Sequence, residues 1–291
     1  MYDTYTHKIT RNGEFTAGYT TYSTNGGAMP TFLFTSLRIL RVTKGAADWQ
    51  IGKRVCKIRK GDIIAVNNVE PRKFLYVDKG ERFECEIFAF LPTIFSQATN
   101  CLRLFYDRSP DFDPVIGSDM PFTKEVNFML DMLVKGFEDS DSPESSSLVL
   151  GLLTAVVSML IKSVEQSFPG TLGRAEHSSH LAAEIIVGAI QYINDNISSK
   201  FGVTELAGHM NLSRGYFSQI FRRYTGSSPS EFINRCRITN VIYLINCGKM
   251  NILSAAMESG FGSASGFYKT FHAVCGSSPR EYLDWKVSEG H

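Results

Sequence analysis

The stretch FSQIFRRYTGSSPSEF, residues 217–232, recurs fifty residues later as FYKTFHAVCGSSPREY, residues 267–282. The match extends well beyond the shared GSSP, because the phenylalanines at the first and fifth positions of the two stretches also coincide. An apolar residue recurring at i and i+4, as Phe217 and Phe221 do, predicts one buried face of a helix. The repeat therefore indicates a duplicated structural unit rather than a chance tetrapeptide.

Each GSSP predicts the end of one helix followed at once by the start of the next. A glycine after the last periodic residue readily adopts the left-handed conformation that ends a helix. The second serine suits an N-cap, with proline at the first helical position and a glutamate three residues later to complete a capping box. The residues in these roles are Gly226, Ser228, Pro229 and Glu231 in the first copy, and Gly276, Ser278, Pro279 and Glu281 in the second.

A tight turn precedes each of the two helices that end at a GSSP. ELAGHMNLS (205–213) aligns with SAAMESGFG (254–262), which pairs Ala207 with Ala256 and Asn211 with Gly260. A small residue followed by one that tolerates positive φ is what a helix-turn-helix requires. Two such units are expected, at 204–224 and 252–274, joined by a long helix over 232–248.

This arrangement resembles the DNA-binding domain of the AraC/XylS family of bacterial transcription regulators. The resemblance covers about residues 185–286, although Val241 stands where the family usually has alanine. It implies a regulator, expected to be an activator, that binds double-stranded DNA and contacts RNA polymerase. The residues that carry the resemblance are Leu206, Ala207, Ser213, Phe217, Phe221, Gly226, Ser228 and Pro229 in the first unit, Arg237 in the joining helix, and Ala256, Gly260, Phe261, Phe267, Phe271, Gly276, Ser278 and Pro279 in the second.

In a helix-turn-helix, the residues opposite the buried face of the second helix reach the major groove. The expected base contacts are Arg214, Ser218, Gln219, Ser265, Tyr268 and Lys269. The expected phosphate contacts are Arg222, Arg223, Ser263 and His272. Gly215 occupies a family base-reading position without a side chain, and Gly266 in the second helix fits either close approach to DNA or a packing constraint. For a lone helix, such polar residues would more often form a solvated face; the duplicated unit favours DNA contact.

The remainder of the chain predicts an α+β protein. Short β-branched and aromatic runs separated by turns, from about Thr16 to Pro92, suggest a sandwich or barrel, and the helical period takes over from about Pro121 to Ser167. Because many family members carry an effector-binding barrel and dimerisation helices, the resemblance implies a cupin-like barrel at 1–120, a helical dimerisation segment at 121–167, a linker at 168–180 and the double helix-turn-helix domain at 181–291. The 14-residue apolar run Leu148–Ile161 is shorter than the roughly 20 residues of a membrane span, so it is expected to face a dimer partner or to pack on the barrel.

A small-molecule effector, such as a sugar or an organic acid, is expected in the barrel. Arg38, Trp49, Arg72 and Phe74 are the candidate contacts, since arginine forks and aromatic faces suit such ligands. An ordinary barrel core plus a surface arginine is the alternative for these residues, and a barrel that serves only dimerisation in an effector-independent regulator is the alternative function. A cupin-type enzyme is disfavoured, because the only histidine before residue 177 is His7. No catalytic constellation, metal site or cofactor is expected.

Charge agrees with this division of the chain. Residues 200–286 hold 10 Lys and Arg against 5 Asp and Glu, a net of +5, whereas residues 1–180 hold 20 against 21, a net of −1. A mildly basic C-terminal part permits a nucleic-acid partner. The six scattered cysteines and the lack of an apolar leader lead us to expect reduced thiols, a cytoplasmic location and no membrane partner.

Overall fold

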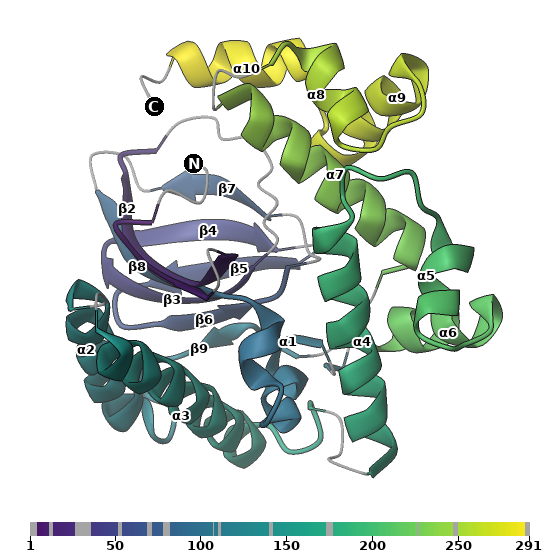
Figure 1. Ribbon diagram of the computed structural model, residues 1–291. Helices are drawn as coiled ribbons and strands as arrows, with labels where there is room; N and C mark the ends of the chain where they lie inside the picture. Colours follow the sequence, from purple (N-terminus) through teal and green to yellow (C-terminus); the bar gives the residue numbers. More distant parts are fainter. Residues whose placement is uncertain are drawn as a thin grey trace.

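The structure, a computed structural model, combines a β-rich N-terminal half with a helical C-terminal half (Figure 1). It describes residues 5–11, 14–26, 36–51, 54–68, 72–77, 82–106, 108–109, 112–139, 142–172, 177–225, 227–246 and 250–288. The expected α+β class is confirmed. Gly226, which was expected to end the first recognition helix, lies outside the described residues.

Two antiparallel sheets form the N-terminal half. The 6-stranded sheet has the order β1-β2-β8-β3-β6-β9 and the 3-stranded sheet the order β5-β4-β7. The strands are β1 (His7–Arg11), β2 (Glu14–Thr24), β3 (Leu37–Lys44), β4 (Ala46–Ile51), β5 (Arg54–Arg59), β6 (Ile63–Val66), β7 (Arg72–Val77), β8 (Phe83–Phe90) and β9 (Val115–Ile116). The expected break at Gly61 is present, with φ at 94°, and β1 precedes the expected start of the strand region.

Alternation along the strands gives the 6-stranded sheet two apolar faces. Leu40 and Val42 of β3 face the 3-stranded sheet and share a core with Trp49 and Phe74. Ile39, on the opposite face of the same strand, joins a second core with the helices that cover the sheet. This is the period-2 pattern of a strand that is buried on both sides. The two sheets thus enclose an apolar interior, in agreement with the barrel expected from the sequence.

A helical hairpin covers the outer face of the 6-stranded sheet (Figure 1). It consists of α2 (Thr123–Glu138) and α3 (Pro143–Ser167). Arg41 of β3 ties the sheet to α2, because its guanidinium lies 2.5 Å from Glu86 and 2.7 Å from Asp131. In the described part of the chain, α3 alone has the length and composition to cross a membrane, a property that core helices share, and 44% of its apolar window is buried inside the protein.

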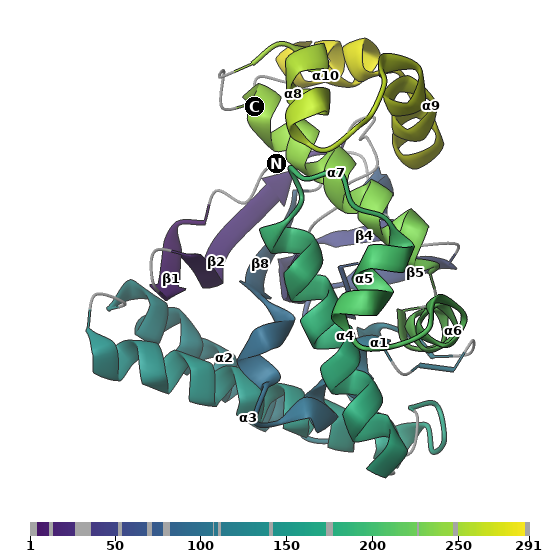
Figure 2. The same ribbon diagram turned by 45° about the vertical axis from the view of Figure 1, so that its right-hand side comes forward.

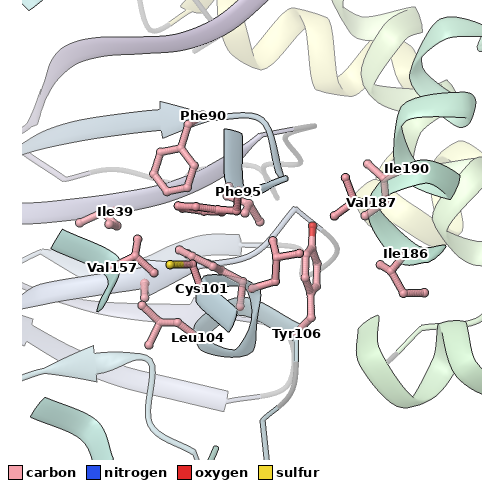
Figure 3. Close-up of a cluster of buried hydrophobic side chains, with 14 of the residues drawn as sticks. Ile39, Phe90, Phe95, Cys101, Leu104, Tyr106, Val157, Ile186, Val187 and Ile190 are labelled. Atoms are coloured by element: carbon pink, nitrogen blue, oxygen red, sulfur yellow. The ribbon is translucent and has the colours of Figure 1, made fainter. Parts of the chain in front are cut away.

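Short helical segments that the sequence did not predict connect the barrel to the rest of the molecule. They are η1 (Pro92–Phe95), η2 (Thr99–Leu102) and α1 (Arg103–Tyr106). Figure 3 shows Phe95 and Tyr106 from these segments between the barrel residue Phe90 and the residues Ile186, Val187 and Ile190 of the first C-terminal helix. The connection between the two halves is therefore a packed apolar interface.

Seven helices are described in the C-terminal half. They are α4 (His177–Asp195), α5 (Val203–His209), α6 (Arg214–Thr225), α7 (Pro229–Asn246), α8 (Ile252–Glu258), α9 (Ala264–Cys275) and α10 (Pro279–Ser288). Helix α4 begins inside the segment that was expected to be a linker. In the same segment, Leu172 is buried and forms a β-bridge with Arg108. The sequence of the segment does not predict this β-bridge, because Leu172 is held by Arg108, which is distant along the chain.

The described cysteines are buried free thiols. They are Cys56, Cys85, Cys101, Cys236 and Cys275. Burial raises the pKa of Cys236 and of Cys275 to about 12, so these thiols stay protonated at neutral pH. This environment agrees with the expected structural role of the cysteines.

Candidate nucleic-acid interface

The two repeats fold as two helix-turn-helix units, α5–α6 and α8–α9, at the two ends of α7 (Figures 1 and 2). Asn211 makes the first turn with φ at 56°, and Gly260 makes the second with φ at 79°. Ala207 and Ala256 are buried where the paired helices meet. The turn residues and the small residues therefore have the places that the sequence predicted.

The GSSP elements cap helices as expected. The backbone N–H of Ser228 donates to the Glu231 carboxylate at 2.8 Å, and that of Ser278 donates to the Glu281 carboxylate at 2.7 Å. In return, the backbone N–H of each glutamate donates to the serine hydroxyl at 3.3 Å. These hydrogen bonds hold the pKa of both glutamates below the usual range. Gly276 ends α9 in the left-handed conformation, with φ at 74°.

The buried face of each recognition helix is aromatic. Phe217 and Phe221 of α6 and Phe267 and Phe271 of α9 are at most 1% exposed. With these side chains turned inward, the opposite face is left to solvent. The sequence-predicted contact residues lie on that face: Arg214, Gln219, Arg222, Arg223, Ser263, Ser265, Tyr268, Lys269 and His272 are exposed, and Ser218 is half-buried.

The cations on this face are available to an external partner. Within the part of the chain that the structure describes, Arg214, Arg222, Arg223 and Lys269 form no ion pair. Three of the four belong to α6, so the first helix carries more unpaired positive charge than the second. Unpaired cations on one surface suit the phosphates of a nucleic acid.

Three residues on the recognition helices go beyond the sequence prediction. Tyr216 of α6 is 55% exposed, and it was not among the predicted contact residues. The Ser263 hydroxyl caps α9 by accepting from the Gly266 backbone N–H at 3.2 Å, which adds a structural role to this candidate phosphate contact. Gly266 is exposed, and a Cβ built there would contact only the Ser263 hydroxyl, at 3.1 Å, so no other element constrains it.

Arg237 of α7 connects the two units. Its guanidinium donates to the carbonyls of Ser199 and Phe201, each at 3.1 Å, and lies 5.2 Å from the centre of the Phe201 ring. These acceptors belong to the loop that precedes α5. Gly260, in the turn of the second unit, packs so closely against this loop that an added Cβ would lie 2.8 Å from the Ile197 carbonyl and 2.9 Å from Arg237 Nε. Arg237 and Gly260 thus form a clamp between the loop of one unit and the turn of the other.

The four candidate effector residues lie inside the barrel. Trp49 and Phe74 stack with their ring centres 5.3 Å apart and an interplanar angle of 12°, as ordinary core aromatics do. Arg38 and Arg72 are 4% and 1% exposed, so neither is a surface arginine. The indole N–H of Trp49 is buried and has no acceptor among the described residues. The barrel interior therefore combines an aromatic wall with two guanidinium groups.

A chain of contacts leads from Arg72 to the helical half. Arg72 donates to the Asn67 carbonyl, and the Asn67 amide donates to the Phe105 carbonyl at 3.1 Å. The Tyr106 hydroxyl donates to Asn68 Oδ1 at 2.6 Å. Burial raises the pKa of Tyr106 well above its usual value, and Tyr106 shares an apolar core with Cys236 of α7. The Asn67-Asn68 turn thus contacts both the barrel interior and the surroundings of α7.

The described residues contain no group of three or more His, Cys, Asp or Glu side chains that could hold a metal ion.

The geometry defines a class of protein in which two helix-turn-helix units follow a β-rich domain along the chain. A helix-turn-helix domain family matches residues 206–284. Solved structures of ToxT from Vibrio cholerae share the fold over most of both chains; in one, bound to an unsaturated fatty acid, the TM-score is 0.56 at 16% identity, covering 94% of this chain and 97% of that one. In another, bound to (E)-4-(8-methylnaphthalen-1-yl)but-3-enoic acid, the TM-score is 0.59 at 17% identity, with 92% and 98% covered.

The regulatory protein PocR of Salmonella typhimurium is 30% identical over 252 residues, which cover 84% of this chain and 70% of PocR. The melibiose operon regulatory protein of Escherichia coli is 32% identical over 91 residues, 31% of this chain and 30% of that protein. The Msm operon regulatory protein of Streptococcus mutans is 28% identical over 131 residues, which span less than half of that protein. The chain belongs to the AraC/XylS family of transcription regulators.

Proposed function

We propose that the protein binds double-stranded DNA sequence-specifically through α6 and α9 and regulates transcription, as an activator that contacts RNA polymerase. The observation that carries the proposal is the pair of recognition helices, which bury their phenylalanines and expose unpaired cations, together with the Gln219 amide on α6. Ser218, Gln219, Ser265, Tyr268 and Lys269, with Arg214, are assigned to base edges, and Arg222, Arg223, Ser263 and His272 to phosphates. Glutamine can bond adenine through two hydrogen bonds, and lysine commonly approaches guanine.

Binding of a labelled duplex from the protein's own upstream region tests this proposal. Gln219→Ala and Lys269→Ala should each weaken the specific complex, whereas Gln97→Ala and Lys57→Ala, at exposed positions in the N-terminal half, should leave it unchanged. Equal affinity for all sequences, or no binding, would sink the proposal. Affinity falls with salt in both specific and non-specific binding, so salt dependence does not distinguish them. The deciding measurement is the affinity for the upstream duplex relative to duplexes of unrelated sequence.

We infer further that an organic acid with an apolar body controls the protein from the barrel interior. Arg38 and Arg72 supply forks for a carboxylate, Trp49 an unused indole N–H, and the Trp49–Phe74 pair an apolar wall. The carboxylic acids bound in the ToxT structures support this class of ligand. The turn at Asn67-Asn68 offers the route by which an occupant beside Arg72 would affect Tyr106 and α7.

Thermal unfolding of the full chain with octanoate, oleate and neutral sugars tests the effector. A ligand that binds only the folded state raises the apparent stability. Octanoate or oleate should raise Tm in the wild type and less in Trp49→Phe, which keeps the aromatic packing but removes the indole N–H. A barrel without response to any acid would support the alternative, a regulator in which the barrel serves only dimerisation.

The outer face of the α2–α3 hairpin is the proposed homodimer interface. Phe128 of α2 is 67% exposed and Leu148 of α3 is 47% exposed, and Leu152 and Met159 extend this apolar face along α3. Exposed apolar patches of this kind mark association sites. The mass measured by light scattering should fall from dimer to monomer on Leu148→Glu, and not on Lys57→Glu at an exposed position of β5, outside the hairpin. A wild-type monomer would contradict this assignment.

A further inference from the structure

A cavity of about 740 Å³ opens between the N-terminal half and α4. Three of its walls belong to the N-terminal half: the β1–β2 end, the segment around η1, and the first turns of α3. The fourth wall is the last part of α4, from Val187 to Asp195. The volume falls within the range of small-molecule sites. Any molecule held there would touch both halves of the protein at once.

The floor of this interdomain cleft is apolar and buried. Ile9, Val187 and Ile190 are 5%, 9% and 1% exposed, and Figure 3 shows the last two on the side of α4 that faces the N-terminal half. The rim is polar: Thr16, Thr93 and Ser146 contribute hydroxyl groups from the N-terminal half. An apolar floor with a few converging polar groups is the usual make-up of a ligand site.

The α4 wall supplies the strongest hydrogen-bonding groups. Gln191, Asn194 and Asp195 line the cleft, and none of their side chains bonds another residue in the described part of the chain. Their i, i+3, i+4 spacing puts them on one side of the helix. Among the described residues that line the cleft, only Asp195 carries an ionisable side chain, and its carboxylate lies at the negative end of the α4 dipole. A carboxylate in this position disfavours an anionic ligand.

We propose that this cleft binds a neutral, hydroxyl-rich small molecule of the sugar or polyol class. Amides and hydroxyls exchange hydrogen bonds with ligand hydroxyls, and a carboxylate accepts them with charge-assisted strength. The carbon face of such a ligand would lie on Ile9, Val187 and Ile190. The site differs in place and in chemistry from the barrel interior, where buried arginines suit an acid, so the two sites would take different ligands.

Occupation of the cleft would restrain α4. The residues that follow Asp195 lead to Ser199 and Phe201, whose carbonyls accept hydrogen bonds from Arg237 of α7. A ligand that braces Asn194 and Asp195 against the N-terminal half would thereby hold the loop on which both reading units are clamped. The effect of cleft occupation on the two reading units rests on the proposed DNA-binding function. The binding of a ligand to the cleft does not rest on that function.

Thermal unfolding and titration calorimetry of the full chain test the binding directly, with no DNA present. The probes are glucose, galactose, sucrose and myo-inositol, with glucuronate and glucosamine as charged counterparts of one sugar. At saturation, at least one neutral probe should raise Tm by several degrees, and glucuronate should not. The response should disappear in Asn194→Leu and in Gln191→Leu, which keep helix α4 but replace amides by apolar groups, and persist in Gln166→Leu, an exposed position at the end of α3.

A panel in which no neutral probe shifts Tm overturns the proposal. So does a response to glucuronate or to glucosamine alone, or a sugar response that survives both cleft substitutions. Since the wild type and the variants can be tested separately for duplex binding, failure of the cleft proposal is distinguishable from failure of the proposed DNA-binding function.

Discussion

The two helix-turn-helix units share a frame but differ in what surrounds them. The first unit belongs to the apolar core between the outer face of the 6-stranded sheet and the α2–α3 hairpin: Leu206, Phe217 and Phe221 are continuous with it. The second unit has a core of its own, with Val241, Phe267 and Phe271 at its centre. A change in the N-terminal half can therefore reach the first unit through packed side chains, whereas the second unit is reached through α7 and the Arg237 clamp.

The largest expected effect comes from removing equivalent phenylalanines. Phe221→Ala and Phe271→Ala should each cost about 3–5 kcal/mol, because each leaves a cavity in a packed core. Phe221→Ala should lower the stability of the first unit together with the N-terminal half. Phe271→Ala should produce a separate, earlier transition of the second unit. Urea unfolding followed by far-UV circular dichroism distinguishes the two, and a single, equally shifted transition in both variants would contradict the comparison.

The next effect concerns the clamp between the units. Arg237→Met removes a guanidinium that serves two carbonyls, at a cost of about 2–3 kcal/mol for charged hydrogen bonds. Affinity should fall more for a duplex with both half-sites than for one with a single half-site, because the spacing of the units is released. Fluorescence anisotropy with the two duplexes measures the ratio. Lys73→Met, at an exposed position of β7, is the control, and an equal loss on both duplexes would argue against a clamp.

The reading faces should act on different parts of the operator. Gln219→Ala and Lys269→Ala should each cost about 1–3 kcal/mol of specific binding, the usual worth of a base contact. The first substitution should relax base preference only in the half-site of α6, and the second only in that of α9. Binding to a randomised duplex library reads out both preferences. Relaxation of the same bases by both substitutions would show that the units do not read separately.

The smallest expected effect concerns the Ser-x-x-Glu capping boxes, which follow both units. Ser228→Ala and Ser278→Ala should each cost about 1 kcal/mol through loss of an N-cap. The pKa values of Glu231 and Glu281 are lowered in the folded state, so their contribution is present above the ordinary glutamate pKa and is lost as pH falls through the lowered one. The variants should therefore lose less stability on acidification than the wild type. Thermal unfolding across this pH range measures it, and identical acid profiles would refute the link.

Local signals made the DNA-binding half predictable. The i, i+4 phenylalanines, the positive-φ residues Asn211 and Gly260 and the Ser-x-x-Glu boxes each act within one or two helical turns, and each is found where the sequence placed it. Tyr216, which is also exposed on α6, was not among the predicted contact residues.

Long-range contacts account for what the sequence did not predict. The burial of Arg38 had a signal, since it has the same parity as the inward-facing Leu40 and Val42. The shared core of Tyr106 and Cys236 and the packing of α4 on η1 had no such signal, because they join segments that are far apart along the chain. The periodicity within either segment does not predict such an interface. The interdomain cleft lies at this interface, so the sequence did not predict the cleft either.

Hydrogen exchange of the intact protein, followed by mass spectrometry at increasing denaturant, tests the central comparison most directly. Amides that open in one cooperative unit share one opening free energy. We predict that peptides from α6 open together with those of β3 and β8, and that peptides from α9 open earlier and alone. Joint opening of α6 and α9, separate from the sheet, would contradict the account.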